Sequence, residues 1–223
     1  MTGRIAHFLL YAFVGLVFLW LVAPTLVIIP MSFNENKSLA FPPAGFSLQW
    51  YANLFQSDDW MRATWQSVQI ATAVALLSTV LGTLAALGLA RMNRRIAGWL
   101  KAFLLAPIIV PVVVIAIGIY AVFLDLGLVG SFTGFILAHT MLAVPFVVVT
   151  VSANLDVFDA RLLTAAQSLG AGPVRAFRTV TLPLIAPGVV SGALFAFVTS
   201  FDELVISLFL NSPYVKPLAV QIY

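Results

Sequence analysis

The sequence predicts an all-α membrane protein, a polytopic helical bundle that extends over residues 1–223. Hydrophobic residues make up 62% of the chain and charged residues only 9%, whereas an ordinary soluble domain is about 25% charged. Within the apolar runs hydrophobic and polar residues do not alternate, which disfavours the strands of a membrane barrel. Five stretches lack Asp, Glu, Lys and Arg, and each is long enough for a helix to cross a bilayer: 8–34, 63–90, 102–124, 126–155 and 179–201.

The apolar runs place the membrane-spanning helices near 8–31, 65–90, 102–124, 130–153 and 184–210. The first run is too long for the apolar segment of a cleavable signal peptide, so we expect it to remain as a span. Prolines inside the third and fourth spans are expected to kink those helices: Pro107, Pro111 and Pro145.

The segment 32–62, between the first two spans, is rich in aromatic residues. Trp50, Tyr51, Phe55 and Trp60 suit a position at the membrane interface. The pattern fits a lid packed on the helix ends as well as it fits a binding role.

Basic residues predict the orientation, because short cytoplasmic loops carry an excess of Lys and Arg. Alternating the sides of five spans puts eight of the eleven basic residues on the side of the N-terminus: Arg4, Arg91, Arg94, Arg95, Lys101, Arg161, Arg175 and Arg178. We therefore expect a cytoplasmic N-terminus, with the loops 91–101 and 155–183 on the same side.

The loop 155–183 carries the signals of a short bent helical segment. Apolar residues recur at helical spacing from Leu162 to Leu169, after a potential capping residue, Asp159. Gly170, Gly172 and Pro173 then predict a sharp helix end, and 174–181 predicts a second short helix before Pro183 returns the chain to the membrane. Periodicity alone does not separate a docking element from an amphipathic helix on the inner leaflet.

The same loop resembles the cytoplasmic loop of permeases of binding-protein-dependent ABC importers. The family pattern is Glu-Ala-Ala, three residues, Gly, nine residues and Ile-x-Leu-Pro; here Thr164, Ala165 and Ala166 precede Gly170, and the pattern ends in Leu182 and Pro183. Thr164 replaces the usual Glu and Val180 replaces Ile. The resemblance extends over nearly the whole chain, most closely to the second permease of spermidine/putrescine-type importers of the bacterial inner membrane, which normally have a sixth span after the stretch that ends here at Tyr223.

This resemblance implies that the loop docks into a groove of a cytoplasmic ATPase, whose closure moves the loop and switches the transport pathway. It also implies a homologous partner permease and a periplasmic substrate-binding protein. The residues expected to make the ATPase contact are Leu162, Thr164, Ala165, Ala166, Leu169, Gly170, Arg175, Leu182 and Pro183. The permease itself is expected to be no enzyme and to need no cofactor: the sequence has no Walker-type phosphate-binding stretch, and with no Cys and two His a catalytic metal cluster is disfavoured.

Two acidic residues, Asp202 and Glu203, fall inside the last predicted span. Carboxylates at membrane depth are costly, which makes them candidates for function. On a continuous helix Thr199, Glu203 and Ser207 share one face with Gly188, Gly192 and Ala196, which predicts close packing at one end and a substrate pathway at the other. The alternative is that the acids lie near the outer interface and contact headgroups or cap a neighbouring helix.

A pair of carboxylates suits a cationic substrate such as a polyamine. Importers of ferric iron, thiosulfate or amino-acid-like solutes, which share the fold, remain alternatives, and so does a secondary transporter that uses the two acids as its own coupling site. His139, inside the fourth span, is expected to bond to a neighbouring helix rather than to relay protons. Gly82 and Gly88 are candidate packing positions.

Overall fold

The computed structural model describes residues 2–37, 41–159 and 161–223, so that residues 38–40 of the external segment and residue 160 of the predicted docking loop lie outside the described residues. Within them the secondary structure is helical apart from one isolated β-bridge, between Asn34 and Phe46, which confirms the all-α fold class. The chain divides into two compact units, Met1–Met61 and Arg62–Tyr223.

The first unit contains α1 (Thr2–Met31) and α2 (Gln49–Gln56). The stretch His7–Met31 of α1 is long and apolar enough to cross a membrane. Aromatic residues of the external segment fold back on the end of α1: the Tyr51 hydroxyl lies 2.7 Å from Ser32 Oγ, and Trp50 Nε1 donates to the Asn34 carbonyl at 2.7 Å.

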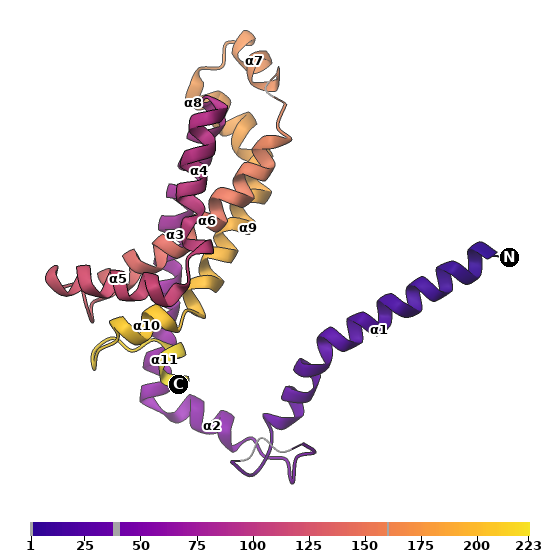
Figure 1. Cartoon of the computed structure of the whole chain (residues 1–223), viewed down its shortest axis with the longest axis vertical. Coiled ribbons are helices and arrows are strands. Elements are labelled where there is room, and N and C mark those ends of the chain that lie inside the picture. The colour runs from indigo at the N-terminus through magenta and orange to yellow at the C-terminus, as the bar shows by residue number, and fades with distance from the viewer. Residues whose placement is uncertain (1, 38–40, 160) are drawn as a thin grey trace. The chain divides into compact units, whose positions relative to one another are not determined.

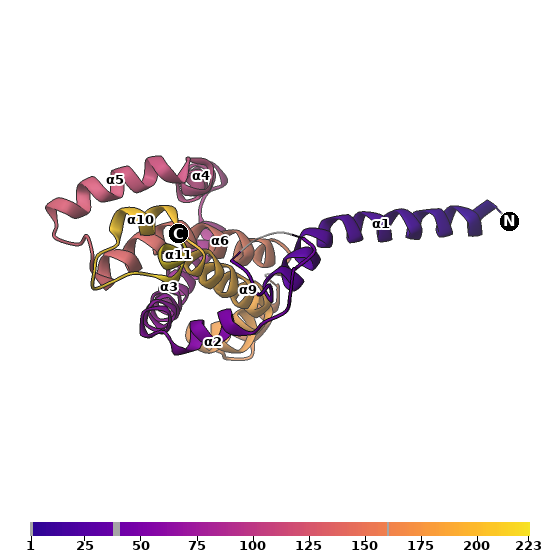
Figure 2. The same ribbon diagram turned by 90° about the horizontal axis from the view of Figure 1, so that it is seen from below.

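In the second unit α6 and α9 lie side by side, as Figures 1 and 2 show. The helices from Asp58 onward are α3 (Asp58–Arg91), α4 (Arg94–Ile109), α5 (Val112–Asp125), α6 (Phe132–Asp156), α7 (Arg161–Ser168), α8 (Pro173–Ala176), the π-helix η1 (Phe177–Thr181), α9 (Leu182–Phe201), α10 (Val205–Leu210) and α11 (Leu218–Ile222).

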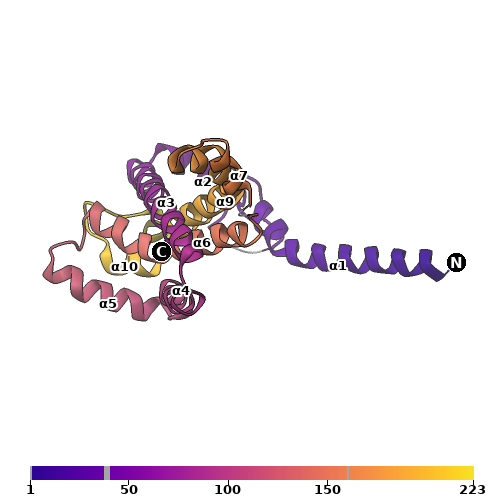
Figure 3. The ribbon, with the colours of Figure 1, turned by 90° about the horizontal axis from the view of Figure 1, so that it is seen from above.

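Four helical stretches of the described residues are long and apolar enough to cross a membrane, or five if the α4–α5 pair counts as one span. The predicted span 102–124 is bent far more than the expected proline kink: α4 and α5 meet at an angle of 99°, as Figures 1 and 3 show. Pro111 causes the break rather than a mild kink: Val110 before it is extended, with ψ 133°, the conformation that a following proline favours.

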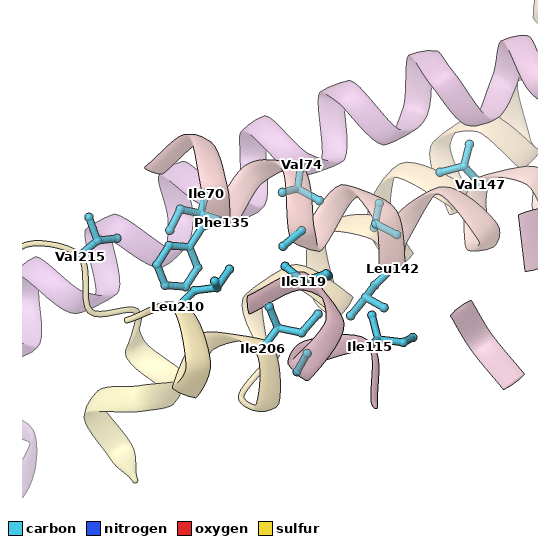
Figure 4. Close-up of a cluster of buried hydrophobic side chains, with 14 of the residues drawn as sticks. Ile70, Val74, Ile115, Ile119, Phe135, Leu142, Val147, Ile206, Leu210 and Val215 are labelled. Carbon is cyan, nitrogen blue, oxygen red and sulfur yellow. The ribbon is translucent and has the colours of Figure 1, made fainter. Parts of the chain in front are cut away.

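The buried core runs along α3, α5, α6 and α10 (Figure 4). Side chains from α6 occupy its centre, with Phe135 and Val147 fully buried. Ile70 and Val74 of α3 meet them from one side, and Ile206 of α10 belongs to the same cluster. Burial of each such side chain contributes about 1.5–3 kcal/mol, although lipid weakens that driving force where a helix could be solvated by the bilayer instead.

Glycines let α9 lie directly against α6. A Cβ on Gly192 would come within 2.6 Å of Thr150 Oγ1 and 3.0 Å of the Val147 Cα, and one on Gly188 within 2.7 Å of the Thr150 carbonyl oxygen. The predicted close packing at this end of α9 is therefore present. Gly82 of α3 approaches Val147 in the same way, whereas Gly88 has open space beside it and serves no packing contact within the described residues.

Candidate functional site

The first candidate site is the elbow formed by α7, the turn at Gly170 and α8, at the end of the α6–α9 pair (Figure 1). Helix α7 begins where Asp159 Oδ1 accepts from the Arg161 amide at 2.9 Å, which supplies the predicted cap. It ends in a Schellman motif: the amide of Gly170 donates to Gln167 O at 2.9 Å, and the amide of Ala171 donates to Ala166 O at 3.0 Å.

Gly170 adopts φ +83°, a left-handed conformation that glycine reaches at little cost. A Cβ there would meet no atom within 4 Å, so the requirement for glycine comes from the backbone and not from crowding. The turn direction of the elbow is thus fixed by one residue.

The elbow presents apolar side chains that the described part of the chain leaves exposed. No residue of α7 is buried, and Leu169 and Val174 are 89% and 70% exposed. Thr164, Ala165 and Arg175 are exposed as well, while Ala166 is half-buried. An exposed helix with small and apolar residues on one side is the form of element that enters a groove on another protein.

The second half of the elbow differs from the sequence expectation. The chain does not turn at Pro183; α8, η1 and α9 form one continuous helical stretch, Pro173–Phe201. The π-helical turn immediately precedes Pro183, where a regular α-helix would bring the proline ring against the carbonyl of Thr179. Leu182 and Pro183 lie in the exposed start of α9, joined to the elbow by helix and not by a flexible loop.

The second candidate site is at the opposite end of α9, where the chain leaves the helix. The expectation of one helix over 184–210 is wrong: α9 ends at Phe201 and α10 begins at Val205. Asp202 and Glu203 occupy the break, so the predicted helical stripe through Thr199, Glu203 and Ser207 is interrupted.

The two acids of the break have different surroundings. Asp202 is exposed. The Glu203 side chain is only 8% exposed, and its Oε2 accepts from the Ser207 amide at 3.1 Å, one of the amide groups that the first turn of α10 leaves without a helical partner. Thr199 is half-buried, and Ser207 is fully buried.

His139 of α6 completes this buried polar cluster. Its Nδ1 lies 2.9 Å from Ser200 Oγ, and its Nε2 lies 3.4 Å from Ser207 Oγ and 3.7 Å from Glu203 Oε2. The expectation that His139 bonds to a neighbouring helix is confirmed. Sequence reasoning did not connect it with Glu203, because nothing in the spacing of two residues on different helices shows that they meet.

A hollow in the first unit is lined by three aromatic residues of the external segment, Trp50, Tyr51 and Trp60, together with Ser32, Asn53 and Leu54. Phe55 is not among them and is 69% exposed. Within the described ranges there is no group of three His, Cys, Asp or Glu side chains that could hold a metal ion.

Comparisons with known proteins agree on one family. The family described as "Binding-protein-dependent transport system inner membrane component" matches residues 78–221. The spermidine/putrescine transport system permease protein PotC of Haemophilus influenzae is 35% identical over 97% of this chain and 84% of its own length. PotC of Escherichia coli K12 is 32% identical over 100% and 83%, and the putrescine transport system permease protein PotI of the same strain is 34% identical over 92% and 75%.

A solved structure has the same fold. It belongs to a bacterial ABC transporter involved in the import of the acidic polysaccharide alginate, and it matches 100% of this chain and 80% of its own with a TM-score of 0.69 and 17% sequence identity. At that identity the likeness concerns the fold alone.

Proposed function

The chain belongs to the family of binding-protein-dependent transport system inner membrane components, and on that premise we propose that it forms half of the pathway by which an ATP-driven importer carries polyamines such as spermidine and putrescine. The observation that carries the substrate assignment is the similarity, over nearly the full chain, to permeases named for these two solutes. The fold does not decide the substrate, since the transporter of similar fold imports an acidic polysaccharide.

The acidic break between α9 and α10 supports a cationic substrate. A protonated amine gains free energy from a carboxylate, most of all where little water screens the pair. Asp202 offers such a carboxylate on an exposed position of the chain. Thr199, Glu203 and Ser207 complete the set of pathway residues, with Glu203 and Ser207 acting from the buried side of the break.

The elbow supports coupling to a cytoplasmic ATPase, in which ATP hydrolysis takes place. Residues Leu162 to Leu169, in α7 and directly after it, would enter a groove of that subunit, and the continuous helical connection from α8 to α9 would carry the displacement into the membrane. The complete importer then comprises this chain, a homologous partner permease, two ATPase subunits and a periplasmic binding protein. This arrangement places the N-terminus and the 155–183 loop in the cytoplasm, in agreement with the distribution of basic residues.

A pull-down tests the coupling. The substitution Gly170→Asp is expected to abolish retention of the ATPase by the solubilised permease, because it changes the turn that orients α7. Gly127→Asp is the matched control: Gly127 also has a positive φ, +65°, and open space around it, but it lies in the α5–α6 turn, away from α7. The coupling role is wrong if wild type and Gly170→Asp retain the ATPase equally, or if neither retains it.

Uptake of radiolabelled spermidine by cells that express the whole importer tests the substrate. The double substitution Asp202→Asn with Glu203→Gln is expected to abolish uptake while the complex still assembles. Undiminished uptake would remove the two acids from the pathway. Absence of polyamine uptake by the wild-type importer would refute the substrate itself.

A further inference from the structure

His139, Ser200, Glu203 and Ser207 form a hydrogen-bonded cluster that joins α6 to both sides of the α9–α10 break. We propose that His139 is a positioning residue of the transport pathway: by holding Ser200 and Ser207, and by lying against Glu203, it fixes the break in the conformation that exposes Asp202. The connection of this role to uptake rests on the proposed function; the positioning itself does not.

The geometry of the ring carries the proposal. His139 is 1% exposed, and its two nitrogens contact different elements: Nδ1 contacts the last turn of α9 through Ser200, and Nε2 contacts α10 through Ser207. Because a serine hydroxyl can donate or accept, both nitrogens are satisfied in either neutral tautomer. One side chain of α6 therefore bridges the interruption from both sides.

Glu203 connects this bridge to the backbone of α10. Its Oε2 accepts from the Ser207 amide and is also the carboxylate oxygen nearest to His139 Nε2. With the carboxylate turned inward, the neighbouring residue in the sequence is left on the outside of the break, where Asp202 is exposed. The cluster therefore holds the Glu203 carboxylate in the interior and leaves Asp202, its neighbour in the sequence, exposed.

The energetic consequence of removing the ring is specific. Truncation to an apolar side chain leaves two buried hydroxyls and a largely buried carboxylate with fewer partners, which costs free energy for each group left unsatisfied. The groups regain partners if the break opens to water. Loss of His139 is therefore expected to loosen α10 rather than to unfold the bundle, because leucine still fills space beside Phe135 and the hydrophobic cluster along α3 and α6 is built by other side chains.

Labelling of introduced cysteines measures this loosening, because the chain contains no native Cys. Ile206→Cys places a thiol at a fully buried position of α10 outside the cluster, and Ala196→Cys places one at a fully buried position of α9. In the assembled importer, reaction of each with a hydrophilic maleimide is followed by mass spectrometry of this chain. His139→Leu is expected to accelerate labelling at position 206 by about tenfold and to leave position 196 unchanged.

Two further variants distinguish positioning from general damage. His139→Gln retains a polar group near the site of Nε2 and is expected to keep labelling at position 206 within about twofold of wild type. Ser78→Ala removes a buried hydroxyl that has no hydrogen-bond partner among the described residues and is expected to change labelling at neither position. Equal labelling at position 206 in His139→Leu and wild type overturns the proposal, as does equal acceleration at both positions or by Ser78→Ala.

Uptake supplies the functional half of the test. His139→Leu is expected to lower spermidine uptake about tenfold at an unchanged amount of assembled complex, with His139→Gln intermediate. Faster labelling at position 206 with full uptake contradicts the role in the pathway. A wild-type importer that takes up no polyamine refutes the proposed substrate instead, and the labelling result still decides whether His139 positions the break.

Discussion

The two ends of helix α9 differ in which side chains are exposed and which are buried. At the elbow, apolar side chains such as Leu169 are exposed and no residue of α7 is buried. At the α9–α10 break, polar side chains such as His139 and Ser207 are buried and bonded to one another. The elbow therefore leaves its apolar side chains exposed, whereas the polar side chains of the break are bonded to one another.

The helix between these ends is about 30 Å long, from 20 residues at 1.5 Å each, which is about the thickness of a bilayer core. Its close contact with α6 through Gly188 and Gly192 leaves little freedom for one end to move alone. The elbow and the acidic break are thus connected through a closely packed pair of helices, as the proposed transmission of a displacement from an ATPase would require.

The largest effect is expected from Gly192→Val, which separates α9 from α6. The added side chain would displace the backbone of Val147, and overpacking of this kind costs about 1–3 kcal/mol. We expect a lower unfolding temperature of the solubilised complex and loss of both ATPase retention and uptake. Gly118→Val is the control, because Gly118 has no atom near its missing Cβ. A variant that loses only one of the two functions would show that the ends are not joined through this pair.

A smaller and local effect is expected from Gly170→Val. A β-branched residue in the left-handed conformation costs about 1–2 kcal/mol, so the turn should move while the α6–α9 contact persists. The expected outcome is an unchanged unfolding temperature with loss of substrate-stimulated ATP hydrolysis by the complete importer. Gly127→Val carries similar strain at φ +65° and should retain hydrolysis; equal behaviour of the two variants would contradict a specific role of the elbow.

The difference between the two ends also explains why the sequence predicted the elbow but not the contacts at the break. The elbow depends on local signals, since Asp159, Gly170 and Pro173 act within a few residues of themselves, and the structure has a helix, a positive-φ glycine and a new helix at those positions. The break depends on a contact between His139 and Ser200, which lie 61 residues apart in the sequence. Helical periodicity relates residues within one helix and therefore cannot predict this contact.

The errors have the same origin. The sequence predicted only a kink within the span 102–124 and a continuous helix over 184–210, because apolar composition indicates the length of a span and not the direction of its helix axis. A 99° bend at Pro111 and an interruption at Asp202 need tertiary partners to hold them, here the packing of α10 against α5 and the bonds to α6. At Pro183 the sequence predicted a turn that the structure does not have, since the preceding π-helical turn accommodates the proline without a break.

The next smaller effect, confined to the affinity for the ATPase, is expected from Leu169→Ser. Burial of a leucine side chain in a partner contributes about 1.5–3 kcal/mol, so the affinity of the permease for its ATPase should fall by about tenfold or more, with no change in the unfolding temperature of the permease. Titration of the purified ATPase onto the permease measures it. Leu126→Ser is the matched control, because Leu126 is also exposed, at 64%, but follows α5. Equal affinities in all three proteins would show that the apolar side of the elbow does not dock.

The smallest effect is expected from Asp159→Ala. The Asp159 carboxylate accepts from the Arg161 amide, and loss of such a cap costs about 0.5–2 kcal/mol of helix stability. Helix α7 has only eight residues, and an isolated helix of that length is marginal in water, so the cost falls on the free elbow. In the bound state the groove would hold α7 in its helical form. Binding therefore has to order the less stable variant helix, and we expect a fewfold loss of ATPase affinity, measured in the same titration. Asp159→Asn keeps a side-chain acceptor and should restore most of the affinity, whereas an equal loss in both variants would assign the effect to the charge and not to the cap.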